Sequence, residues 1–229
     1  RHHDLTRHIE QHVPVRFQPG TAVSYSGPGY AVLSRALGEA MRGSEWTDLR
    51  SLLDKELMSP LDLHPQSWSI GYDDDLFRVD GLDLHATWGG AAFTLRATAR
   101  IGQLLLQQGV WQKRQLLSDH VVKRAITFDG MTTTPNSIQT GQQPAPALGW
   151  WSNEFGALKS LPRDAFLAAG AGHRVLIVVP SLDLVIVRYG QRLGVDHWDG
   201  DFWQVLDEVL LAPVIHAIDD DHQSATCCQ

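Results

Sequence analysis

Cysteine is almost missing from this chain. Its 229 residues contain only Cys227 and Cys228, which are adjacent and lie near the end of the sequence. Two neighbouring cysteines in a polar terminal segment cannot link distant parts of a fold, and no metal-ligand spacing surrounds them. These observations exclude a disulfide-stabilised scaffold and a zinc-finger-like module. We therefore predict neither a structural metal nor a cofactor, and cysteine usage assigns no compartment.

Long apolar runs and basic runs are also missing. No apolar segment approaches the roughly 20 residues that a membrane span requires. The formal net charge is −7, and Lys and Arg nowhere form a run. This balance argues against nucleic acid and against an anionic membrane surface as partners. The opening residues RHHDLTRHIEQH lack the apolar core of a signal peptide, and we interpret the chain as cut at its N-terminus.

The remaining composition is that of an ordinary globular domain, with 43% apolar and 20% charged residues. Apolar residues at helical spacing, together with capping residues, predict several helices. Ser44 or Thr47 is expected to cap the third of these, and Ser118 the fifth. Residues 61–88 and 127–146 are expected to be loops. The predicted helices are Asp4–His12, Gly29–Met41, a helix ending at Leu57, Thr94–Gln108, Asp119–Ile126 and Asp199–Leu211.

The strongest strand signal is the segment Arg174–Tyr189, RVLIVVPSLDLVIVRY. Two β-branched runs flank Pro180–Asp183, which predicts a hairpin. Both runs are apolar at nearly every position, so both faces of these strands should be covered by helices. Helices followed by strands and a closing helix predict an α+β fold. We expect one domain over residues 1–216, mainly helical over about 25–130, with the sheet and closing helix over about 146–211. Residues 217–229 are expected to form a disordered tail.

The segment Phe17–Leu33, FQPGTAVSYSGPGYAVL, predicts a short extended run centred on Tyr25, followed by a Gly/Pro turn and the start of a helix. This order presents the Tyr25 hydroxyl at a junction between loop and helix. The segment resembles the Tyr-x-Asn motif of the serine β-lactamase-like hydrolases. That family includes class C β-lactamases, penicillin-binding proteins and esterases.

Four further segments resemble the same family in its chain order, and the match runs from about Phe17 to Leu211. The ordered series is far more specific than any single piece. The segments are SRALGEAMRGSEWTDLRSLLDKELMSPLDL, WGGAAFTLRATARIGQLLLQQGVWQKRQLLS, ALGWW and FLAAGAGHRVLIVVPSLDLVIVRYG.

The resemblance implies a β-lactamase/transpeptidase-like fold, an antiparallel sheet flanked by helices with a helical subdomain. It also implies cleavage of an ester or amide bond in a small molecule through an acyl-enzyme. In that scheme Tyr25 relays a proton, and Gly170 and Gly172 offer backbone N–H groups to a substrate carbonyl beside His173. Each assignment has a structural alternative. Tyr25 alone would be a packed turn residue, the glycines would mark a bulge or tight turn, and His173 would be a structural histidine.

The sequence also departs from the family pattern. No serine has a lysine three positions later; the nearest approach is Ser51 with Lys55, four apart. Gly27 stands where the family has the Asn of Tyr-x-Asn, and Gly170-Ala171-Gly172 replaces a triplet led by Lys or His. The segment that carries the nucleophile is thus expected to lie outside this chain.

Three interpretations of these departures stay open. The chain is the C-terminal portion of a serine hydrolase, a non-catalytic relative that keeps the fold for binding, or one half of a split enzyme. With part of the sheet missing, we expect self-association or a complementing N-terminal segment. His8 and His12 are four apart on a predicted helix, but without a third ligand nearby they indicate a solvated helix face rather than a metal site.

Overall fold

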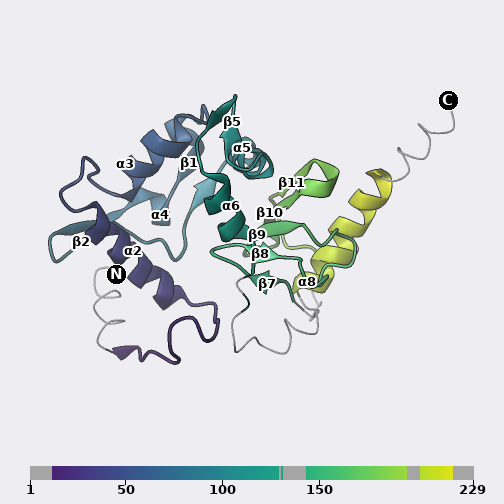
Figure 1. The fold of residues 1–229 in the computed structure, drawn as a ribbon, viewed down its shortest axis with the longest axis horizontal. Coiled ribbons are helices and arrows are strands. Elements are labelled where there is room, and N and C mark those ends of the chain that lie inside the picture. Colours follow the sequence, from purple (N-terminus) through teal and green to yellow (C-terminus); the bar gives the residue numbers. More distant parts are fainter. Residues whose placement is uncertain (1–11, 129, 131–142, 195–201, 219–229) are drawn as a thin grey trace. The chain divides into compact units, whose positions relative to one another are not determined.

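The computed structural model describes residues 12–128, 130, 143–194 and 202–218 (Figure 1). The chain forms two compact units, residues 1–100 and residues 101–229, which are treated separately below. Most of the predicted helix Asp4–His12, most of the loop 127–146 and nearly all of the expected disordered tail 217–229 lie outside the described residues.

In the first unit, helix α2 spans Gly27–Met41. Ser26 caps it, because the Ser26 side chain accepts a hydrogen bond from the Gly29 N–H at 3.1 Å. The helical spacing of Tyr30, Leu33, Leu37 and Met41 predicts that they form one apolar face, and this prediction was wrong at Leu33, which is half exposed. The buried face carries small residues instead: Ala31, Ser34 and Gly38.

Those small residues let α2 pack closely on the strand Leu82–His85, which is β3. A Cβ atom added at Gly38 would lie 2.5 Å from Leu84 Cδ2, so a larger residue would require the Leu84 side chain to shift. The Ser34 hydroxyl donates a hydrogen bond to the His85 carbonyl at 2.7 Å. The small residues at this contact did not belong to the apolar face that the sequence predicts.

The next helical segment comprises α3 (Leu49–Leu53) and the π-helical turn η1 (Asp54–Met58). Asp48 caps it, and the prediction of Ser44 or Thr47 was wrong. The Asp48 carboxylate accepts from the Ser51 N–H at 2.8 Å, and the Ser51 hydroxyl is hydrogen-bonded to the Asp48 N–H in return. Asp caps a helix as well as Ser or Thr does, and this reciprocal box fixes the start at Leu49.

The prediction of a loop over residues 61–88 was also wrong. Strand β2 (Leu76–Val79) pairs antiparallel with β3 around Asp80-Gly81, two residues with φ of 50° and 80°. An Asp-Gly pair between alternating apolar residues is a strong hairpin signal. Its core comprises Phe77, Val79, Leu82, Leu84 and Ala86. Also in this region are η2 (Pro65–Ser67), β1 (Trp68–Ser69), α4 (Gly71–Asp74) and β4 (Ala92–Phe93), which pairs with β1.

Helix α5 (Leu95–Leu106) begins in the first unit and ends in the second. The sequence predicts that Leu95, Ala99, Leu104 and Leu105 face inward; Leu104 and Leu105 are buried, whereas Leu95 is half exposed. A small hairpin of β5 (Val110–Trp111) and β6 (Arg114–Gln115) follows. Helix α6 (Asp119–Ile126) then begins after Ser118, whose side chain accepts a hydrogen bond from the Val121 N–H, which confirms the predicted cap.

The second unit is built on an antiparallel five-stranded sheet in the order β11-β10-β9-β8-β7. The predicted hairpin is confirmed: β10 and β11 pair with Ile177 opposite Ile186, and η3 (Pro180–Leu182) connects them. β9 pairs with the other side of β10. The strands are β7 (Ala145–Pro146), β8 (Trp151–Ser152), β9 (Phe166–Gly170), β10 (Arg174–Val179) and β11 (Leu184–Arg188).

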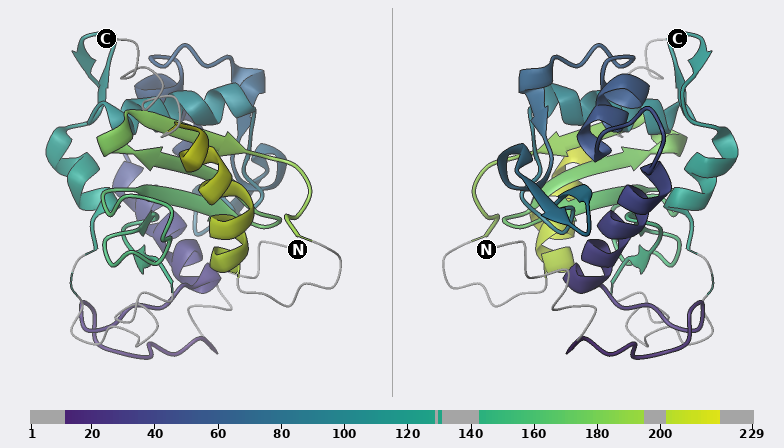
Figure 2. Two further views of the ribbon diagram at one scale, coloured as in Figure 1. Left: turned by 90° about the vertical axis from the view of Figure 1, so that its right-hand side faces the viewer. Right: turned by 90° about the vertical axis from the view of Figure 1, so that its left-hand side faces the viewer.

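Both faces of this sheet are covered, as the apolar strands predict. The closing helix, α8 (Phe202–Val205) and η4 (Leu206–Leu211), lies across one face (Figure 2). Its Leu206 and Leu211 belong to the same buried cluster as Ile177 of β10. On the other face, Leu105 of α5 and Val122 of α6 cluster with the alternate residues of β9 and β10. The apolar spacing within the predicted helix Asp199–Leu211 also predicts that Val209 faces the sheet, but Val209 is 45% exposed.

Two buried polar side chains hold the loop between β8 and β9. The Asn153 amide nitrogen donates to the carbonyls of Leu158, Leu161 and Pro162, and its oxygen accepts from the Leu158 N–H. Asp207 of the closing helix accepts from the N–H groups of Lys159 and Ser160 at 3.0 and 3.1 Å. The loop is therefore tied both to itself and to the closing helix.

Candidate active site

Tyr25 lies outside any helix or strand, directly before Ser26, the capping residue of α2. Its side chain is 75% exposed, and its ring centroid lies 5.9 Å from that of Tyr30, in the first turn of α2. Burial and the neighbouring Tyr25 raise the pKa of Tyr30 above its usual value. Tyr30 is held in turn through its backbone, since its carbonyl accepts from the Thr87 hydroxyl at 3.0 Å. The Tyr25 phenol is therefore accessible to solvent beside the capped start of α2.

Gly170, Gly172 and His173 meet in the turn between β9 and β10. Gly170 is the last residue of β9 and pairs with Arg174, the first residue of β10. Gly172 has a φ of 72° and His173 a φ of 56°, both in the left-handed region. The Gly-x-Gly segment therefore forms a tight turn at the end of the central strands. A Cβ atom at Gly172 would meet nothing closer than 4.0 Å, so its backbone angle rather than crowding favours glycine there.

Arg188, at the end of β11, holds this turn from the neighbouring strand. Its guanidinium donates to the carbonyls of Gly172 at 3.2 Å and His173 at 2.8 Å, and also to the Gln191 carbonyl. Sequence reasoning did not single out Arg188. The only signal was an arginine ending an otherwise apolar strand, and its partners become visible only in the folded hairpin.

His173 is buried, with 2% of its surface exposed. Its ring stacks on Phe202 of α8 at a centroid distance of 4.4 Å and an angle of 15°. Nδ1 accepts a hydrogen bond from the Leu193 N–H at 3.2 Å, so this nitrogen carries no proton in the folded chain. Burial lowers the pKa of His173 below its ordinary 6.5, and Arg192 and Arg188 lower it further. A neutral imidazole thus ties the turn to the closing helix.

The structure therefore places the predicted site residues in two groups. Gly170, Gly172 and His173 are neighbours in the second unit, and Tyr25 belongs to the first. The described residues contain no set of three or more His, Cys, Asp or Glu side chains arranged to hold a metal ion. Across the same residues, no helix combines the length and hydropathy needed to cross a bilayer.

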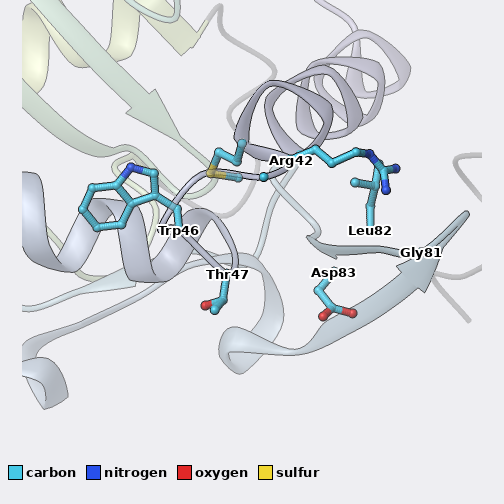
Figure 3. A pocket seen from close by; sticks show the side chains of 9 residues that line it. Arg42, Trp46, Thr47, Gly81, Leu82 and Asp83 are labelled. Atoms are coloured by element: carbon cyan, nitrogen blue, oxygen red, sulfur yellow. The ribbon is translucent and has the colours of Figure 1, made fainter.

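A small open pocket of about 170 Å³ lies in the first unit, between the end of α2 and the turn of the β2–β3 hairpin (Figure 3). Trp46 and Met41 line it beside the polar groups of Arg42, Thr47 and Asp83. The Arg42 guanidinium is already bound by both carboxylate oxygens of Glu39. None of the residues predicted from the sequence as site residues lines this pocket.

Comparison with known proteins agrees with the fold described above. The model of the Beta-lactamase family matches residues 1–209. The chain belongs to the Beta-lactamase family. This membership confirms the resemblance read from the Tyr25 segment and its four companions, and with it the α+β fold of helices and antiparallel sheet.

Two solved structures share this fold with the β-lactamase-family chain. A candidate beta-lactamase from Bacteroides dorei DSM 17855 is 15% identical with a TM-score of 0.60, over 95% of this chain and 63% of that one. A candidate 6-aminohexanoate-dimer hydrolase from Bacillus anthracis is 17% identical with a TM-score of 0.59, over 90% of this chain and 47% of that one. The chain thus spans roughly half to two thirds of these structures. No curated protein matches it.

Proposed function

We propose that this β-lactamase-family chain is part of a serine hydrolase that cleaves an ester or amide bond of a small molecule through an acyl-enzyme. The observation that carries the proposal is the exposed Tyr25 directly before the capped helix α2, in a chain whose family match covers residues 1–209. The 229-residue sequence contains no Ser-x-x-Lys motif, so the proposal requires a nucleophile from outside this sequence.

Tyr25 is assigned proton transfer in this scheme. Acyl transfer requires a proton to leave the attacking hydroxyl and another to reach the leaving group. A phenol can both donate and accept a hydrogen bond, and the 75% exposure of Tyr25 leaves it open to a substrate. The neighbouring Tyr30 is half-buried and tied by its backbone to Thr87, which gives Tyr25 a fixed aromatic neighbour.

The Gly170–Gly172 turn is assigned a substrate-binding role through its backbone. Arg188 binds the carbonyls of Gly172 and His173, so the turn is held in one orientation before any substrate arrives. Donors fixed in advance stabilise a developing oxyanion better than donors that must reorganise. In this proposal the buried His173 positions the turn and makes no contact with the substrate, which refines the role that the sequence implied for it.

A non-catalytic, ligand-binding relative is the second candidate. The observation that favours it lies at Gly170-Ala171-Gly172, which stands where the family has a triplet led by Lys or His. The nearby imidazole of His173 is buried against Phe202. Such a protein would bind an ester or amide without turning it over.

The test uses the protein extended by any residues encoded upstream of Arg1, assayed with nitrocefin and p-nitrophenyl acetate. We expect hydrolysis, and we expect Tyr25→Phe to lower its rate by about 10²–10⁴-fold, the usual contribution of a general acid or base. The free energy of unfolding should change by less than about 0.5 kcal/mol, because the side chain is exposed.

Tyr30→Phe is the matched control, since it removes a hydroxyl from the neighbouring ring and should retain most of the activity. The 229-residue chain alone should form no covalent adduct with a fluorophosphonate probe by intact mass. An adduct on that chain would reveal a nucleophile within it. Full activity of Tyr25→Phe would remove Tyr25 from the mechanism, and binding without turnover by the extended protein would favour the non-catalytic candidate.

A further inference from the structure

The turn between β2 and β3 joins an aspartate directly to a glycine. Asp80 and Gly81 have φ of 50° and 80°, and the strand pairing resumes at Val79 and Leu82 on either side of them. Gly81 is exposed, and a Cβ atom added to it would meet nothing within 4 Å, so the space beside it is open. Because glycine has no side chain, its main-chain nitrogen is the least hindered that a residue after aspartate can have.

This pair of residues permits a reaction within the chain. When the Gly81 nitrogen attacks the Asp80 side-chain carbon Cγ, a C–N bond forms and closes a succinimide ring. One carboxylate oxygen leaves as water, taking the Gly81 N–H proton and one proton from the solvent. A water molecule then opens the ring: attack at Cγ restores aspartate, and attack at the main-chain carbonyl carbon yields isoaspartate. In isoaspartate the main chain runs through Cβ and Cγ, the former main-chain carbonyl is a free carboxylate, and one proton returns to the solvent.

A cation on α2 opposes the first step of this reaction. The Arg35 guanidinium lies 2.9 Å from Oδ2 of Asp80, and the Arg35 side chain is only 24% exposed. The ion pair stabilises the charged carboxylate, which is a poor electrophile, and directs it toward α2. A second arginine of the same helix, Arg42, reaches the Asp80 main-chain carbonyl at 3.5 Å, while its guanidinium is bound by Glu39.

We propose that Asp80-Gly81 is a modification site, at which aspartate converts to isoaspartate at a rate restrained by the Arg35 ion pair. The proposal is independent of the hydrolase assignment, because it uses only the β2–β3 hairpin and α2 of the first unit. Its co-reactant is water, which reaches the turn directly, since the Asp80 side chain is 46% exposed.

Conversion disrupts the contact between the hairpin and α2. Isoaspartate adds one atom to the main chain of a turn whose two residues set the register of β2 against β3. Leu82 follows the turn and is 6% exposed, and a Cβ atom added at Gly38 of α2 would lie 3.7 Å from Leu82 Cδ1. The modified chain should therefore be less stable than the parent, and the modified fraction should grow with the age of the protein.

The experiment ages the folded 229-residue chain for several weeks at neutral pH and body temperature. Peptide mapping with electron-transfer fragmentation locates isoaspartate, so position 80 is read separately from Asp129-Gly130 and Asp199-Gly200. We expect isoaspartate at position 80 in the parent. Arg35→Ala should raise its rate of formation about two- to fivefold, the factor by which a partly exposed ion pair shifts an equilibrium. Asp80→Glu should give no product at this position, because glutamate closes the larger ring far more slowly.

Arg42→Ala is the matched control on the same helix, and it should form isoaspartate at the parent rate. Arg35→Lys keeps a cation on α2 and should stay near that rate, whereas the neutral Arg35→Gln should behave as Arg35→Ala does. In concentrated guanidinium the parent and Arg35→Ala should react equally fast, because the unfolded chain has no ion pair. Equal rates for these two proteins when folded would overturn the restraint by Arg35. The absence of isoaspartate at position 80 from the aged parent would overturn the site itself.

Discussion

The two regions to which sequence analysis assigned chemistry are built in opposite ways. Tyr25 lies outside any helix or strand and is three quarters exposed, with a ring neighbour at 5.9 Å. The turn Gly170–His173 is held by Arg188 from one strand and by Phe202 from the closing helix. In the proposed scheme Tyr25 has to reach a substrate, whereas the backbone donors of the turn have to stay in place. The difference teaches that changes to the turn should cost stability, and a change at Tyr25 should not.

The largest effect on stability is expected from Arg188→Ala. The substitution removes charge-assisted hydrogen bonds to the carbonyls of Gly172, His173 and Gln191, and we expect a loss of about 2 kcal/mol. Urea unfolding measures the change. Arg192→Ala is the control, because Arg192 is exposed and removing it should cost less than about 0.5 kcal/mol. Equal losses for the two variants would show that Arg188 does not hold the turn.

A smaller effect, about 1 kcal/mol, is expected from Gly172→Ala, since alanine is strained at a φ of 72°. Gly170→Ala provides a control two residues away. Gly170 is outside the positive-φ set, and a Cβ atom there would lie 3.7 Å from the Arg174 carbonyl oxygen, an ordinary contact. Urea unfolding of both variants should rank Gly172→Ala as clearly the less stable. The reverse order would contradict the turn geometry.

The smallest effect is the pH dependence that His173 adds. Because burial, Arg192 and Arg188 lower its pKa in the fold, the unfolded chain binds the proton more tightly. The contribution of His173 to stability is therefore complete above pH 6.5 and is lost as the pH falls from there through the lowered pKa. Unfolding measured across this range should show a shallower acid decline for His173→Asn than for the parent. Parallel declines would mean that His173 is not held neutral.

The hairpin Arg174–Tyr189 was predictable because its β-branched runs and turn residues are adjacent in sequence, and the same holds for Ser118 before α6. The β2–β3 hairpin was missed although Asp80-Gly81 stood between alternating apolar residues. The same segment contains Asp73, Asp74 and Asp75 together with Gly and Pro residues, and these residue types favour a loop. Local signals therefore sufficed where they agreed with one another and failed where they competed.

For the candidate site, residues in short local motifs were predictable and residues defined by distant contacts were not. Tyr25 and the glycines are recognisable in the sequence because each belongs to a short motif. The burial of His173 was not, because its stacking partner Phe202 lies 29 residues later in the chain. Arg188 was missed for the same reason, since its hydrogen bonds form only once β11 lies beside β10. Contacts between segments distant in the sequence decide which residues carry the site and which support it.

Asp207 gives the closing helix a second role besides covering the sheet. Asp207 is 8% exposed, and its carboxylate accepts hydrogen bonds from the N–H groups of Lys159 and Ser160. If this helix detached, the N–H groups of Lys159 and Ser160 would lose their acceptor. The apolar surface beneath Leu206 would become exposed to water at the same time. We therefore expect the helix and the loop 153–162 to open as one cooperative unit, so that protease cleavage of this loop would report on opening of the closing helix.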